Sequence, residues 1–160
     1  MKEGGVNVNA AISQEVLDTI FDEVTRQVTE TVAGIRLYRG NTIPNGEIYT
    51  VYAAFERGFS SSLSLSAEAS VFIRLTQHIM ENPQVTPQDV EDFTKEYFNV
   101  LCGNIASKLF QITKVASRFE IPSFHRGHYQ PENHQDQFAI HYFSDKNEGV
   151  QLTHHTPVIK

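Results

Sequence analysis

The sequence has 160 residues, a single cysteine, Cys102, and no long apolar run. One cysteine excludes an internal disulfide and a zinc site built from several cysteines. The longest unbroken apolar run covers residues 51–55, whereas a membrane-spanning helix needs about 20 residues. The first residues also lack the apolar stretch of a secretory signal. We therefore expect a cytoplasmic protein with no membrane partner.

Positive charge is also scarce, because 13 Lys and Arg residues face 19 Asp and Glu residues, giving a net charge of −6. This balance argues against a nucleic-acid partner, since contacts to phosphates need a basic face. Apolar residues make up 40% of the chain, which is typical of a globular protein. A chain of this length buries about two thirds of its unfolded surface, so it needs neither a disulfide nor a metal to fold.

The first half of the chain combines one long amphipathic helix with strands. Residues 1–12 have the composition of a flexible arm, and Ser13 and Gly34 are suited to begin and end a helix over 13–33. Apolar residues then alternate with polar ones, which predicts two or three antiparallel strands up to residue 66. We expect Ser66 to be the N-cap of a second, shorter helix. That helix is expected over residues 67–80.

The second half repeats the order of a long helix followed by strands. Pro87 suits the first turn of a helix over 86–113, and strands are expected after it, with a polar loop before the second of them. The expected strands cover residues 118–121, 137–143 and 149–153, and the expected loop covers residues 123–135.

The two long helices align with each other. Residues 14–18 match residues 88–92, and continuing the alignment places Asp22 on Glu96 and Thr25 on Asn99. We therefore predict an α/β (α+β) fold in which two long helices pack on an antiparallel sheet made of two pseudo-repeated halves. The domain is expected to span 13–160, with half-repeats of about 13–85 and 86–160.

A polar stripe lies beside the apolar stripe of the helix predicted over 86–113. It contains Asp92, Glu96, Asn99 and Gly103, whose spacings of four, three and four place them on one helical face. A glycine inside a helix costs about 1 kcal/mol relative to alanine. We expect something to approach closely there, either a packed helix or the surface of a partner.

This stripe, followed by Asn104, Ile121-Pro122 and Gly127, resembles the CheC/CheX family of chemotaxis phosphatases. Proteins of that family carry an Asp/Ser-x-x-x-Glu-x-x-Asn motif on a long helix and then a strand with a proline. The chain length and the single full motif are more similar to CheX than to CheC. Thr25 replaces the asparagine that a second site on the first helix would need, so we expect no site there.

The resemblance implies hydrolysis of the phosphoaspartate of a CheY-like response regulator. Asn99 would orient the attacking water and Glu96 would pair with a lysine of the regulator, while Asp92 and Gly103 would contact the partner. The regulator supplies Mg²⁺, so no metal or other cofactor is expected in this chain. The resemblance also implies a homodimer.

Other interpretations remain open. Glu96 and Asn99 could belong to a solvated helix face, or to a module of the same fold that binds a regulator without catalysis. Cys102 suits a core thiol better than a nucleophile, and one of Tyr97 and Phe98 is expected to border the docking face. The late histidines are better explained as surface or strand residues than as the metal ligands of a metal-dependent hydrolase. These histidines are His125, His128, His134, His141, His154 and His155.

Overall fold

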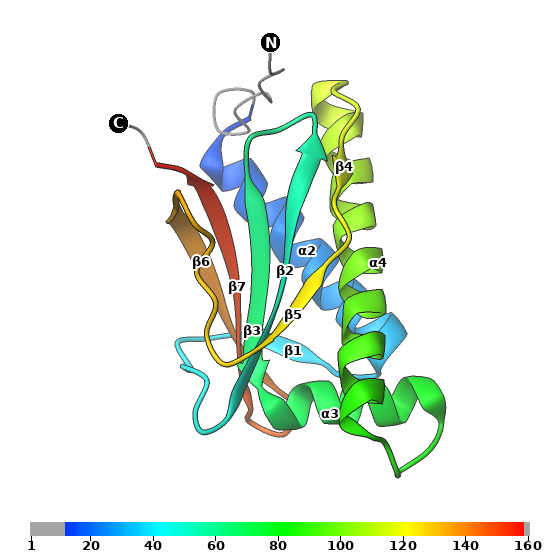
Figure 1. Cartoon of the computed structure of the whole chain (residues 1–160). Helices are drawn as coiled ribbons and strands as arrows, with labels where there is room; N and C mark the ends of the chain where they lie inside the picture. Colours follow the sequence, from blue (N-terminus) through cyan, green and yellow to red (C-terminus); the bar gives the residue numbers. More distant parts are fainter. Residues whose placement is uncertain (1–11, 159–160) are drawn as a thin grey trace.

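The computed structural model describes residues 12–158, which form three helices and one antiparallel sheet (Figure 1). Most of the predicted arm, residues 1–11, lies outside the described residues. The helices are α2 (Gln14–Ala33), α3 (Ala69–Met80) and α4 (Pro87–Thr113). The strands are β1 (Leu37–Arg39), β2 (Ile48–Arg57), β3 (Ser62–Glu68), β4 (Arg118–Phe119), β5 (Ser123–Arg126), β6 (His134–Ser144) and β7 (Gly149–Pro157). None of the described helices is long and apolar enough to cross a membrane.

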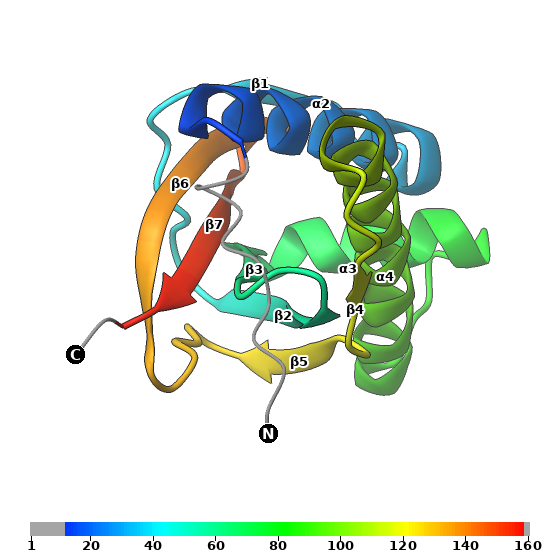
Figure 2. The same cartoon turned by 90° about the horizontal axis from the view of Figure 1, so that it is seen from above.

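The strands follow the order β1-β6-β7-β3-β2, and β4 and β5 both pair with β2. Seen from above, the sheet curls around the core, and α2 and α4 cover its open side (Figure 2). With β5 placed beside β2, the order is symmetric about its centre. Counted from one end it is β1, β6, β7, and counted from the other end it is β5, β2, β3. The predicted mixed fold is therefore confirmed, and the strand order has the symmetry that two related halves would give. The sequence repeat itself stays a prediction.

The ends of the two long helices follow from local sequence. The Ser13 hydroxyl accepts a hydrogen bond from the backbone N–H of Val16 at 3.2 Å, and Gly34 ends α2 with a φ of 67°. At the start of α4, Thr86 and Asp89 form a reciprocal capping box, with Pro87 in the first turn. Ser13 and the capping box satisfy N–H groups that have no partner inside the helix, whereas the N–H of Gly34 donates to the carbonyl of Glu30 at the end of α2. The predicted boundaries of both long helices are confirmed.

Two local predictions were wrong because backbone pairing extended one strand and formed another that was not expected. Ser66 lies in β3, where its hydroxyl meets that of Thr50 at 2.9 Å, and pairing with β2 continues to Glu68. Helix α3 therefore begins at Ala69, and no side-chain hydrogen bond caps it. In the predicted polar loop, residues 123–126 form β5, which pairs with β2 in register from Tyr49 to Tyr52.

The core lies between the inner face of the sheet and the two long helices. Tyr97 and Phe98 are both buried, so the expectation that one of them borders the docking face was wrong. The Tyr97 hydroxyl lies 2.5 Å from the Thr29 hydroxyl and links α4 to α2. Cys102 is buried beside them, and burial raises the pKa of its thiol, so the thiolate is disfavoured. This environment supports the core thiol rather than the nucleophile.

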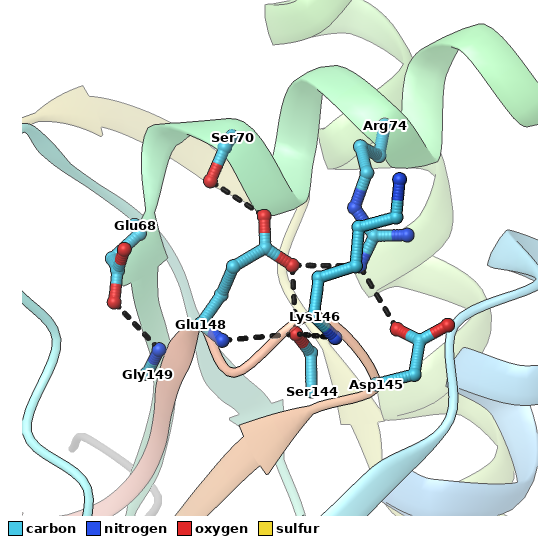
Figure 3. A network of polar contacts seen from close by, with 8 residues as sticks. All are labelled: Glu68, Ser70, Arg74, Ser144, Asp145, Lys146, Glu148 and Gly149. Carbon is cyan, nitrogen blue, oxygen red and sulfur yellow. Dashed lines mark hydrogen bonds and ion pairs between the residues drawn. The ribbon is translucent and has the colours of Figure 1, made fainter.

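A polar network joins the start of α3 to the turn between β6 and β7 (Figure 3). The buried carboxylate of Glu148 accepts hydrogen bonds from Ser70 at 2.5 Å, Arg74 at 2.6 Å and Ser144 at 2.7 Å. The Arg74 guanidinium also donates to Asp145 at 3.0 Å. The bonds from Ser70 and Arg74 join α3 to the turn, and the bond from Ser144 lies within the turn. The network therefore fixes α3 against the end of the sheet where β6 turns into β7.

Candidate functional site

The four residues of the predicted polar stripe are all exposed on α4. The amide of Gln88 donates to the Asp92 carboxylate at 2.9 Å, so Asp92 is bound within its own helix. Among residues 12–158, no side chain or backbone group forms a hydrogen bond or ion pair with the side chains of Glu96 and Asn99. Their carboxylate and carboxamide therefore point to solvent one helical turn apart, available to a partner.

These side chains share a shallow groove with the segment that follows β4. The groove encloses about 410 Å³. Its walls are Asp92, Lys95, Glu96 and Asn99 from α4, and Ile121 and Pro122 from the connection between β4 and β5. The structure thus brings together the helix motif and the Ile-Pro pair, which are separated by more than 20 positions in the sequence.

Three residues of this groove, Lys95, Ile121 and Pro122, were not predicted as site residues. Lys95 forms an ion pair with Glu91 at 3.5 Å and supplies a positive charge to an otherwise acidic wall. Ile121 is 90% exposed. An isoleucine just before a proline, at the end of a predicted strand, is the sequence signal that could have marked it. Its exposure follows from the break in strand pairing between Phe119 and Ser123, which no local pattern specifies.

Gly103 has no packed neighbour. A Cβ atom built at this position would meet nothing within 4 Å. The sequence suggested that either another helix or the surface of a partner approaches this glycine. Within the described residues, no helix of this chain packs against it. What remains is a flat patch of helix surface one turn beyond Asn99, open to a partner.

The corresponding positions on α2 face the interior. Thr25 is fully buried, and Asp22 is 8% exposed. The Asp22 carboxylate is held by Arg26 at 2.8 Å and by the Tyr142 hydroxyl at 2.9 Å. Asp22 and Thr25 are therefore part of the folded interior and are not available to a partner.

The late histidines do not converge on a metal site. No group of three or more His, Cys, Asp or Glu side chains within the described part of the chain could hold a metal ion. His154 is buried and packs edge-on against Phe21, with ring centroids 5.4 Å apart. Burial lowers its pKa to about 4. The structure therefore does not favour the metal-dependent hydrolase.

His155 lies between Ser64 and Asp136 in a row that resembles a catalytic triad. Its Nε2 is 2.8 Å from the Ser64 hydroxyl, and its Nδ1 is 3.0 Å from the Asp136 carboxylate. However, Ser64 lies within β3, which pairs with strands on both sides, so its backbone leaves no N–H free to stabilise an oxyanion. Both Ser64 and His155 are almost completely buried. This row ties the strands together on the outer face of the sheet.

Comparison with known proteins assigns the family. The sequence profile described as "Chemotaxis phosphatase CheX" matches residues 49–144, which include all of α4 and the Ile-Pro pair. The chain is a member of the CheX family. The predicted resemblance is therefore confirmed at the family level, whereas no curated protein matches the chain.

Solved structures confirm the CheX-like fold. A chemotaxis protein CheX from Desulfovibrio desulfuricans superposes with a TM-score of 0.70 at 17% identity, covering 86% of this chain and 97% of that one. A CheX–CheY–BeF3–Mg²⁺ complex from Borrelia burgdorferi matches with a TM-score of 0.66 at 12% identity, covering 87% and 96%. FliY from Thermotoga maritima matches with a TM-score of 0.58 at 12% identity, covering 92% of each chain.

Proposed function

We propose that this CheX-family chain hydrolyses the phosphoaspartate of a CheY-like response regulator at the exposed face of α4. The observation that carries the proposal is that the side chains of Glu96 and Asn99 lie next to each other in an open groove and have no partner among the described residues. Both residues lie in the part of the chain that the family profile matches. The Borrelia burgdorferi relative, solved as a CheX–CheY–BeF3–Mg²⁺ complex, supports a partner of the same class.

Asn99 would position the attacking water. An acyl phosphate is already labile, so the main task is to hold a water in line with the bond between phosphorus and oxygen that breaks. A carboxamide can accept a hydrogen bond from that water and donate one to it, and it carries no charge that would repel the phosphoryl oxygens. The exposed Asn99 amide, without a partner inside the described chain, is free to do this.

Glu96 would fix the register of docking. Its exposed carboxylate is available for an ion pair with a lysine beside the phosphorylated aspartate of the regulator. Burial of that pair in the complex would strengthen it, because water no longer screens the charges. The Mg²⁺ would belong to the regulator, and the buried Cys102 thiol takes no part, so this chain contributes positioning rather than a nucleophile.

The test is the lifetime of a phosphorylated response regulator from the same genome. The wild-type chain should shorten it, and Asn99→Ala and Glu96→Gln should each remove at least about 100-fold of that acceleration, the cost of losing correct positioning. Gln27→Ala is the matched amide control, because Gln27 is exposed on α2 and lies outside the groove. Glu23→Gln on α2 is the matched carboxylate control. Both controls should keep full activity.

The second candidate is a module of the same fold that binds the regulator without hydrolysing it. FliY from Thermotoga maritima shares this fold at 12% identity, and a shared fold does not by itself imply hydrolysis. It predicts that the chain binds the activated regulator but leaves its lifetime unchanged, and that Asn99→Ala binds as the wild type does. The homodimer implied by the family resemblance stays a prediction.

A further inference from the structure

Ile121 is the most exposed of the large apolar side chains in the described part of the chain. Its exposed fraction is 90%, and the next is Ile43, at 73%. A single exposed isoleucine is ordinary on a protein surface. Its position is informative, however, because Ile121 lines the same groove as Glu96 and Asn99.

The backbone around Ile121 is held firmly. The ring of Phe119 stacks on Phe55 with centroids 4.0 Å apart, and the N–H of Glu120 donates to the carbonyl of Ala54 at 2.7 Å. On the other side, Pro122 is buried and has a fixed φ, and β5 begins at the next residue. The Ile121 side chain is therefore presented to solvent on an ordered backbone, so a partner would bind it with little loss of conformational entropy.

A second apolar side chain lies on the opposite flank of Glu96. Val100 is 38% exposed and follows Glu96 by four residues, so it lies one helical turn beyond Glu96. The groove with Ile121 lies toward Asp92, Lys95 and Asn99 and does not include Val100. The acidic and amide groups are thus bordered by apolar residues on both sides.

We propose that Ile121 is the apolar anchor that sets the affinity for the regulator, with a smaller contribution from Val100. The inference rests on the proposed function and extends it from catalysis to partner choice. The surface fits a response regulator with an apolar depression close to the lysine and phosphoaspartate of its own site. Interfaces commonly gain most of their binding energy from a few well-packed residues, surrounded by near-neutral contacts that exclude water.

The experiment measures binding and kinetics for one set of variants. Binding of a CheY-like regulator activated with beryllofluoride and Mg²⁺ should weaken about 10-fold on Ile121→Ala. In dephosphorylation assays the same variant should raise KM by a similar factor and leave kcat unchanged, whereas Asn99→Ala should lower kcat. Ile43→Ala is the matched control, because Ile43 is an exposed isoleucine between β1 and β2, outside the groove. Thermal unfolding checks that each variant is folded.

The outcomes separate this inference from the proposed function. If the wild type dephosphorylates the regulator and Ile121→Ala changes KM no more than Ile43→Ala does, the anchor is overturned and the phosphatase stands. If the wild type binds without dephosphorylating, and Ile121→Ala weakens that binding, the anchor stands and the phosphatase is overturned. A fall in kcat without a change in KM would also contradict the anchor.

Discussion

Replacing Arg74 by methionine tests the network that holds α3 to the sheet (Figure 3). Methionine keeps much of the apolar stem of the side chain and removes the guanidinium that pairs with Glu148 at 2.6 Å. The Glu148 carboxylate, whose side chain is 10% exposed, would keep only its bonds to Ser70 and Ser144. A buried charge would then lack its opposite charge.

The expected loss is about 2–3 kcal/mol in the free energy of unfolding at pH 7. Removing one partner of a fully buried ion pair costs about 3–5 kcal/mol. We take a smaller value because the Arg74 side chain is 20% exposed and the two serine hydroxyls remain. Urea unfolding measures the change, with Arg57→Met, at an exposed arginine of β2, as the control. The double variant Arg74→Met/Glu148→Gln should recover much of the loss, because neither charge then remains.

The pH dependence gives this prediction a second readout. Burial alone would raise the pKa of Glu148, but hydrogen bonds from the Arg74 guanidinium and two serine hydroxyls hold it below its ordinary value. In the wild type this stabilisation is complete at neutral pH and is lost as the pH falls through the lowered pKa. Without Arg74 the carboxyl group takes up a proton more readily, so the deficit of Arg74→Met should shrink at pH 4. An equal deficit at pH 7 and pH 4, or no deficit, would refute the reasoning.

Two further predictions concern Gly103 and His154. Gly103→Ala should stabilise the fold by up to about 1 kcal/mol in urea unfolding, because alanine favours the helix and its Cβ meets no neighbour. The same variant should weaken regulator binding if the partner approaches the bare helix, and unchanged binding would contradict that contact. The pKa of His154 is lowered to about 4, whereas an unfolded histidine takes up its proton near 6.5. Stability should therefore fall by about 3 kcal/mol between pH 6.5 and pH 4, and His154→Leu should reduce this fall; equal pH profiles would refute it.

Local signals in the sequence predicted the long helices and the candidate site. The signals at Ser13, Gly34 and Pro87 depend on neighbouring residues alone, and the polar stripe of α4 follows from helical spacing. For this reason the predicted helix boundaries and the common face of Glu96 and Asn99 agree with the structure. Their catalytic roles stay predictions.

The features that were missed depend on contacts between distant parts of the chain. β5 forms because residues 123–126 pair with β2, about 70 positions earlier, and its polar composition gives no sign of this. Similarly, Tyr97 and Phe98 both enter the core because α4 packs against the sheet on one side and α2 on another. The exposure of Ile121 is set by where the pairing of β4 stops. Periodicity within one segment cannot specify such long-range contacts.

The inward orientation of Asp22 and Thr25 determines the valency of the molecule. A chain with two equivalent outward faces could bridge two regulators and crosslink them. Here the face on α2 is used to bind Arg26 and Tyr142, so only the α4 face is left for this kind of docking. Titration with an activated regulator should accordingly reach a plateau at one partner for each chain, and the chain would act on its targets one at a time.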